Sequence, residues 1–150
     1  MKTVFIDYET YYDKEYSLRK MTPVQYVLDH RFECIGCAVK EGLDGESYWV
    51  DGNPRDTMLV SHNALFDACI TAWRFNFHPR LTADTLSIAR ATIGHETKSL
   101  SLANVALKLD IGVKGGTVHK VEGMGAAAIK AAGLYDEYIQ YALNDVELCA

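Results

Sequence analysis

The sequence lacks any long uninterrupted hydrophobic run. No stretch approaches the roughly 20 uncharged apolar residues that a membrane-spanning helix requires. The N-terminal apolar segment is interrupted by Asp7 and Glu9 before it reaches the length of a signal peptide. We therefore expect a cytoplasmic protein with no membrane partner.

The cysteine pattern of a zinc or redox module is also incomplete. Of the four cysteines, Cys34 and Cys37 form a CxxC pair, but no second pair is present to complete the four ligands that structural zinc requires. Both lie in a predicted strand, where an odd separation directs side chains to opposite faces. We expect ordinary buried thiols.

An excess of positive charge is absent as well. The formal net charge is −5, whereas nucleic-acid-binding domains are usually basic. Nucleic acid is still not excluded as a substrate if the acidity belongs to a metal site, because bound cations reverse the local field. The 150 residues, 49% apolar and 23% charged, are ordinary for one globular domain with its own core.

Sequence patterns predict strands early in the chain and helices late, without internal repeats. The predicted strands cover residues 2–9, 31–42, 46–52, 58–63 and 81–84. A short helix is predicted after Pro23, and the other predicted helices cover residues 64–75, 85–93, 98–110, 126–132 and 134–150. The second and third strands would form an antiparallel hairpin through the turn residues GLDG. This order favours an α/β domain, a mixed sheet flanked by helices.

Two carboxylates, Asp7 and Glu9, end the first predicted strand in the segment VFIDYET. Side chains two residues apart on a strand point to the same face. Two ionised carboxylates about 4 Å apart repel each other by roughly 4 kcal/mol at an effective dielectric near 20. A shared proton, a basic neighbour or a metal ion could offset this repulsion, at a strand end where ligands of open sheets often bind.

Other acids could converge on that point. Asp67 lies in the first turns of a predicted helix, four residues after Asn63. Tyr141 and Asp145 are four residues apart, so they share one helical face about 6 Å apart along the axis. Asp84 is another candidate, although a helix N-cap explains it equally well. Taken singly, these residues also fit a solvent-exposed acid or a packing pair.

Three segments taken together carry a resemblance to a known family. FIDYET, HNALFD and YALND resemble, in order, the DxE, Nx(2–3)FD and Yx(3)D motifs of the DEDD exonuclease superfamily. Residues 5–36 are especially similar to the opening of phage-type DNA polymerases, where a proofreading exonuclease begins at the N-terminus. Tyr141 indicates the tyrosine branch, because the histidine branch would have His where Gln140 stands.

The resemblance implies an RNase H-like fold with a mixed five-stranded sheet, and 3′→5′ hydrolysis of DNA 3′ ends with two divalent ions, Mg²⁺ or Mn²⁺. Asp7 would bridge both ions, and Glu9 and Asp145 would complete the first site. Asp67 would hold the second ion, largely through water. Tyr141 would orient the attacking water. Hard cations of this kind prefer oxygen ligands.

The expected substrate-binding residues are Thr10, Leu18, Asn63 and Phe66. Helix capping is an equal alternative for Asn63, and core packing is an alternative for Phe66.

For two further groups of residues, the sequence allows either a contact with nucleic acid or a place in an ordinary loop. The loop residues Tyr11, Tyr12, Tyr16, Arg19 and Lys20 could stack on bases and contact phosphates, or form a polar loop with buried tyrosines. Lys114 and Lys120 could contact phosphates or lie in a solvated loop. His62, next to Asn63, is expected either to be structural or to support the site residues without contacting the substrate.

We expect residues 1–150 to be a single 3′→5′ exonuclease domain. It would be either part of a longer DNA polymerase or a separate phage exonuclease, in the cytoplasm of a bacterium or of a phage-infected host. Its partners would be a single-stranded DNA 3′ end and a polymerase domain in cis or in trans. Two alternatives remain, an RNase D-like exonuclease acting on RNA 3′ ends and a non-catalytic nucleic-acid-binding module of the same fold.

Overall fold

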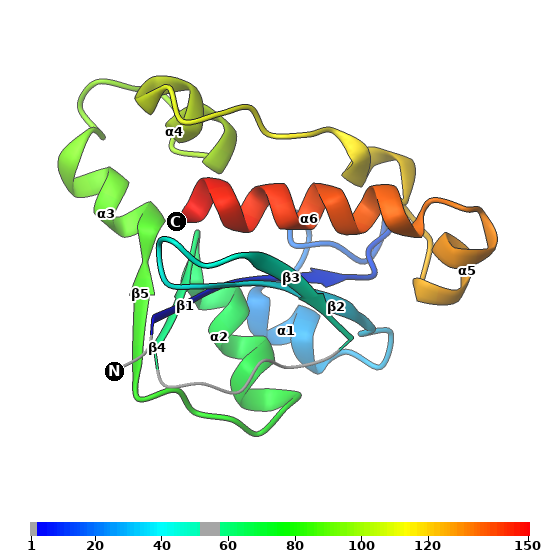
Figure 1. Cartoon of the computed structure of the whole chain (residues 1–150). Coiled ribbons are helices and arrows are strands. Elements are labelled where there is room, and N and C mark those ends of the chain that lie inside the picture. Colours follow the sequence, from blue (N-terminus) through cyan, green and yellow to red (C-terminus); the bar gives the residue numbers. More distant parts are fainter. Residues whose placement is uncertain (1–2, 52–57) are drawn as a thin grey trace.

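A five-stranded sheet forms the central layer of the structure, a computed structural model that describes residues 3–51 and 58–150 (Figure 1). The strands are β1 (Thr3–Thr10), β2 (Cys34–Glu41), β3 (Ser47–Val50), β4 (Met58–Ser61) and β5 (Leu81–Asp84). Their order across the sheet is β3-β2-β1-β4-β5. β1 and β3 are antiparallel to β2, whereas β4 is parallel to β1 and β5. The predicted mixed sheet and its hairpin are confirmed; Lys2 and Gly52, at the ends of two predicted strands, lie outside the described residues.

Helices cover both faces of this sheet (Figure 1). They are α1 (Pro23–Leu28), α2 (Ala64–Trp73), α3 (Thr85–Thr92), α4 (Leu102–Leu109), α5 (Ala126–Ala131) and α6 (Tyr135–Cys149). α1 and α2 lie against one face, and the long helix α6 crosses the other. A short 3-10 helix, η1 (Thr117–Lys120), lies in the segment for which no helix was predicted. In the described part of the chain, no helix is long and apolar enough to cross a membrane.

The central strand β1 packs on both faces, and this determines where its acids point. Ile6 and Tyr8 belong to the core under α1 and α2, whereas Phe5 belongs to the core under α6. Because side chains alternate along a strand, Asp7 and Glu9 follow Phe5 onto the face that α6 covers. Residues that form an ordinary buried strand thus carry two carboxylates toward a single helix.

The expectation that Cys34 and Cys37 face opposite sides of the sheet is wrong. Both side chains contact the core under α1 and α2. The cause is a bulge: Glu9 pairs with Gly36 but Thr10 pairs with Cys34, so β2 has one extra residue, Ile35. An extra residue reverses the alternation on one side of a bulge. Cys37 is buried, as predicted, whereas Cys34 is half-buried; neither forms a disulfide in the part of the chain that the structure describes.

Asp84, at the end of β5, caps two helices. Its Oδ1 accepts hydrogen bonds from the amide of Leu86 in α3 (3.1 Å) and from the amides of Asn63 (2.9 Å) and Ala64 (3.2 Å) at the start of α2. Burial opposes ionisation of Asp84, but these bonds and one from the Ser87 hydroxyl lower its pKa below the usual value. The predicted N-cap is confirmed, and the same carboxylate also fixes the first turn of α2.

Replacement of Asp84 by alanine should destabilise the protein by about 2 kcal/mol, because a single lost cap typically costs about 0.5–2 kcal/mol and two helix starts are affected. The free energy of unfolding would be measured by urea denaturation followed by circular dichroism. Asp44→Ala, which removes an equal charge from an exposed turn, is the control. Equal stabilities of the two variants would contradict the double-capping role.

Candidate functional site

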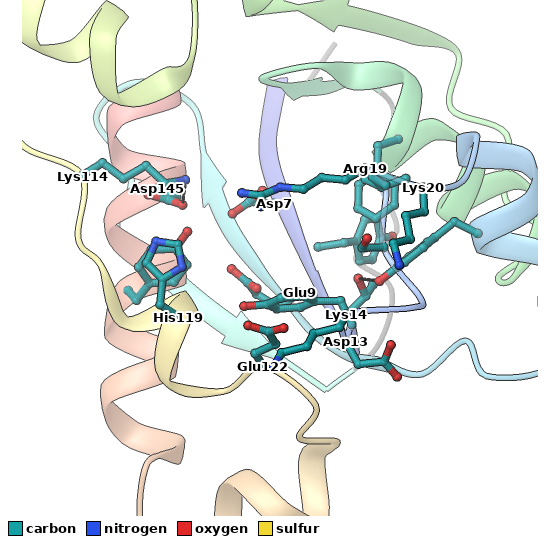
Figure 2. A pocket seen from close by; sticks show the side chains of 18 residues that line it. Asp7, Glu9, Asp13, Lys14, Arg19, Lys20, Lys114, His119, Glu122 and Asp145 are labelled. Carbon is teal, nitrogen blue, oxygen red and sulfur yellow. Dashed lines mark hydrogen bonds and ion pairs between the residues drawn. The ribbon is translucent and has the colours of Figure 1, made fainter.

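Three carboxylates meet at the end of β1 that α6 crosses. Asp7 and Glu9 from β1 and Asp145 from α6 each offer an oxygen, and these atoms all lie within 4.8 Å of one another. Glu9 is 8% exposed and Asp145 2% exposed, whereas Asp7 is half-buried. Figure 2 shows Asp145 on its helix facing the strand that carries Asp7 and Glu9. The structure thus brings together three of the four acids predicted as metal ligands.

Asp67, the fourth acid, reaches the same strand end from the helix on the other face. It is buried, and its Oδ1 accepts a hydrogen bond from the amide of Tyr8 at 3.2 Å. β4 pairs with β1 only as far as Phe5. Beyond that pair, the Asp67 carboxylate, instead of a β4 residue, is the hydrogen-bond partner of the β1 main chain at Tyr8. Its charge is among those that raise the pKa of Asp7. Asp67 therefore lies beside the three-acid group rather than within it.

Two tyrosines of α6 line the acids. Tyr141 is 7% exposed, and its ring stacks with that of Tyr138 at a centroid distance of 6.4 Å. The Tyr138 hydroxyl donates a hydrogen bond to Glu9 Oε2 at 2.6 Å. Tyr138 was not predicted as a site residue. Helical spacing could have found it, because it precedes Tyr141 by three residues and Asp145 by seven and so shares their face.

The electrostatics of the acids favour a bound cation. Burial raises the pKa of Asp7 well above its usual value, and the charges of Glu9, Asp67 and Asp145 add to this effect. Burial likewise raises the pKa of Glu9 and that of Asp67 to about 7. Among the residues that the structure describes, Asp145 Oδ1 is buried and has no hydrogen-bond partner. An all-carboxylate donor set with an unsatisfied oxygen fits a hard divalent cation such as Mg²⁺ or Mn²⁺.

Lys114 contacts this acidic group directly. Its ammonium forms an ion pair with Asp145 Oδ2 and lies 5.2 Å from the centre of the Tyr141 ring. The solvated-loop alternative is therefore wrong for Lys114. Lys120, in the same segment, instead pairs with Glu137 at an exposed position. Both lysines lie in the Gly-rich segment of residues 111–125, which has no periodic pattern that could have distinguished one from the other.

A pocket of about 780 Å³ opens beside the acids (Figure 2). Lys14, Arg19 and Lys20 lie on the side opposite Asp145 and Lys114. A second pocket of about 730 Å³ is lined by His62, Asn63, Arg90 and Lys98 among others. The two pockets share Asp7 and Lys114, so the acidic group lies at their junction. The first pocket thus combines all three acids with basic side chains, and the second combines Asp7 with basic side chains, despite the negative net charge.

The predicted substrate-binding residues divide between these pockets. Thr10, Leu18 and Phe66 line the first pocket, and Asn63 lines the second. Leu18 is 42% exposed, whereas the Thr10 hydroxyl is buried in a 2.9 Å hydrogen bond with Tyr26. Phe66 also packs edge-on against Tyr26, so its packing alternative is compatible with lining the pocket.

Asn63 occupies the N-cap position of α2, as its capping alternative predicted, but it does not cap the helix with its side chain. Its side chain makes no capping hydrogen bond, and Asp84 caps the helix instead. His62 is structural, as expected, because its ring nitrogens contact the Thr85 hydroxyl and the Leu100 carbonyl.

The tyrosines after β1 have different roles. Tyr16 is fully buried, stacks on Tyr26 at 4.2 Å and donates a hydrogen bond to the Tyr26 carbonyl, so it cannot stack on a substrate base. Tyr11 donates to Asp13. Tyr12 lines the first pocket. The buried-tyrosine alternative is thus confirmed for Tyr16.

The sheet order and the covering helices define an RNase H-like α/β fold. Among solved structures, the chain is similar to NrnC of Brucella melitensis with bound Mg²⁺, with a TM-score of 0.65 and 19% identity over 98% of this chain and 67% of that one. NrnC bound to pGG gives a TM-score of 0.59 at 19% identity over the same shares. No protein-family model and no curated protein matches the chain. These likenesses show the fold.

The metal-free protein should lose stability as the pH rises from about 4 to about 7. Glu9 and Asp67 have folded-state pKa values of about 7, above the roughly 4 of unfolded chains, so only the native state retains these protons in that range. Urea denaturation at several pH values in EDTA would measure the decline. Mn²⁺ should reduce this loss of stability, because it binds the ionised acids. Glu9→Gln should make the free energy of unfolding less dependent on pH. A stability that rises with pH in EDTA would contradict these shifts.

Proposed function

We propose that this protein is a metal-dependent 3′→5′ exonuclease. The observation that carries the proposal is the group Asp7, Glu9 and Asp145, whose oxygens lie within 4.8 Å of one another at the junction of two pockets. The likeness to NrnC, which is known with Mg²⁺ and with pGG, supports it. So does the order of the three sequence motifs that resemble DEDD exonucleases.

The acids would divide two cations between them. Asp7, Glu9 and Asp145 would hold one ion, and Asp7 and Asp67 the other, with water completing the shell around Asp67. Two divalent ions in such a site activate the attacking water and stabilise the attacking and leaving oxygens of an in-line phosphoryl displacement. The chain therefore needs no histidine base.

Tyr141 and Tyr138 would position the reacting groups. Burial, with the charge of Asp145, raises the pKa of Tyr141, so its hydroxyl remains protonated at neutral pH and acts by hydrogen bonding. Tyr141 can orient the attacking water beside Asp145. Tyr138 holds Glu9 in place through its 2.6 Å hydrogen bond, which fixes one ligand before a cation binds.

The first pocket would hold the 3′ end of the substrate strand. Its apolar residues Leu18 and Phe66 can pack against a base, and the basic side chains Lys14, Arg19 and Lys20 that line the same pocket can contact phosphates. A negatively charged strand would thus meet basic side chains and metal-neutralised carboxylates in one pocket.

For the nucleic acid, we favour short RNA 3′ ends, the RNase D-like alternative. The likeness to NrnC bound to pGG supports this choice over DNA proofreading. DNA 3′ ends are the second candidate, because residues 5–36 resemble the opening of phage-type DNA polymerases.

Asp7→Ala or Asp145→Ala should reduce hydrolysis of a 3′-labelled oligonucleotide by at least about 10³-fold, because each removes a metal ligand. Tyr141→Phe should keep partial activity, since only an orienting hydroxyl is lost. Rates would be measured with Mg²⁺ and Mn²⁺ and with EDTA, with Asp44→Ala as the control. Near-normal turnover of Asp7→Ala would contradict the assigned roles.

RNA and DNA oligonucleotides of one sequence and several lengths should separate the candidate functions. We expect a larger kcat/KM for the RNA series, with nucleotides released from the 3′ end. A preference for DNA would instead favour proofreading. Metal-independent binding of both series without cleavage would favour the non-catalytic module and refute the exonuclease.

A further inference from the structure

The positive charge of Lys114 lies beside the acidic group Asp7, Glu9 and Asp145 and offsets part of its negative charge. Its ammonium is paired with Asp145 Oδ2, the side chain being 29% exposed and that of Asp145 2% exposed. It also lowers the pKa values of Asp7 and Glu9, against the effect of burial. The ammonium occupies one of the two carboxylate oxygens of Asp145, and its positive charge repels a divalent cation that would bind the other, Oδ1. Lys114 and a cation therefore compete for Asp145.

The backbone around Lys114 is held on α6, although the lysine side chain is long and flexible. The Val113 carbonyl accepts a hydrogen bond from Asn144 Nδ2 at 3.2 Å. On the other side of Lys114, Gly115 lies so close to Tyr141 that an added Cβ would be 3.3 Å from Tyr141 Cδ2. The Cα of Lys114 is thus fixed beside the site, while four methylene groups allow its ammonium to move between partners.

Lys114 also lies at the junction of the two pockets, which share it with Asp7. A strand whose scissile phosphate meets the acids must bring that phosphate to the junction. An ammonium displaced from Asp145 would then have the phosphate oxygens within reach. Negative charge on those oxygens is what a fixed cation stabilises in phosphoryl transfer.

We propose that Lys114 has two successive partners: it neutralises Asp145 in the metal-free site, and it contacts the substrate phosphate once a cation has taken its place. This inference rests on the proposed exonuclease function and adds a phosphate contact to it. A purely structural ion pair would behave differently, because its loss would destabilise the protein equally with and without metal.

The first test is calorimetric titration of the full chain with Mn²⁺ in the absence of nucleic acid. Lys114→Met keeps an unbranched stem over Tyr141 but removes the competing charge, so Mn²⁺ should bind about tenfold more tightly. Lys120→Met is the matched control, because Lys120 lies in the same segment but pairs with Glu137. An unchanged or weaker affinity of Lys114→Met would overturn the proposal.

Thermal unfolding provides a readout independent of activity. Without metal, Lys114→Met should unfold at a lower temperature than the wild type, because the group Asp7, Glu9 and Asp145 loses a neighbouring cation. With saturating Mn²⁺ the difference should disappear. A difference of equal size in both conditions would show a structural ion pair and overturn the proposal.

Kinetics at saturating metal test the second partner. Lys114→Met should raise KM for an oligonucleotide and lower kcat, and Lys114→Arg should restore part of both. Unchanged kcat and KM would overturn the phosphate contact while leaving the exonuclease intact. If the wild type itself neither binds Mn²⁺ nor cleaves RNA or DNA, the proposed function fails, and this inference fails with it.

Discussion

Repulsion between buried carboxylates is the constraint around which this structure is organised. Asp7, Glu9 and Asp145 converge within 4.8 Å, and Asp67 lies next to them. Such a group is stable only with protons, basic neighbours or metal ions, and the chain provides for more than one of these. Raised pKa values favour retained protons, Lys114 supplies an ammonium, and the oxygen ligands suit a divalent cation.

The rest of the fold holds these acids against that repulsion. β1 is the central strand, paired on both edges, so the positions of Asp7 and Glu9 are set by two neighbouring strands. α6 is anchored on the sheet by Tyr138 and Val146, both fully buried, which fixes Asp145 between them. Core packing, rather than attraction among the polar groups, therefore supplies the free energy that brings like charges together.

Sequence periodicity predicted most of the fold and much of the candidate site. The strand period placed Asp7 and Glu9 on one face, and the helical period placed Tyr141 with Asp145. The bulge at Ile35 was not predictable, because an extra residue in a strand has no compositional mark here. Nor was the contact of Lys114 with Asp145, since it depends on how a Gly-rich segment packs across α6. Such tertiary contacts have no period that a single sequence displays.

The hydrogen bond between Asp67 and the Tyr8 amide has a consequence for how this site tolerates sequence change. Its donor belongs to the main chain, so any residue except proline at position 8 can supply it. The bond to the carboxylate therefore does not depend on the side chain at position 8, which is constrained instead by the core under α1 and α2. What must be inherited is the length of β4, because an extra β4 pair beyond Phe5 would bring that strand toward the place where Asp67 binds.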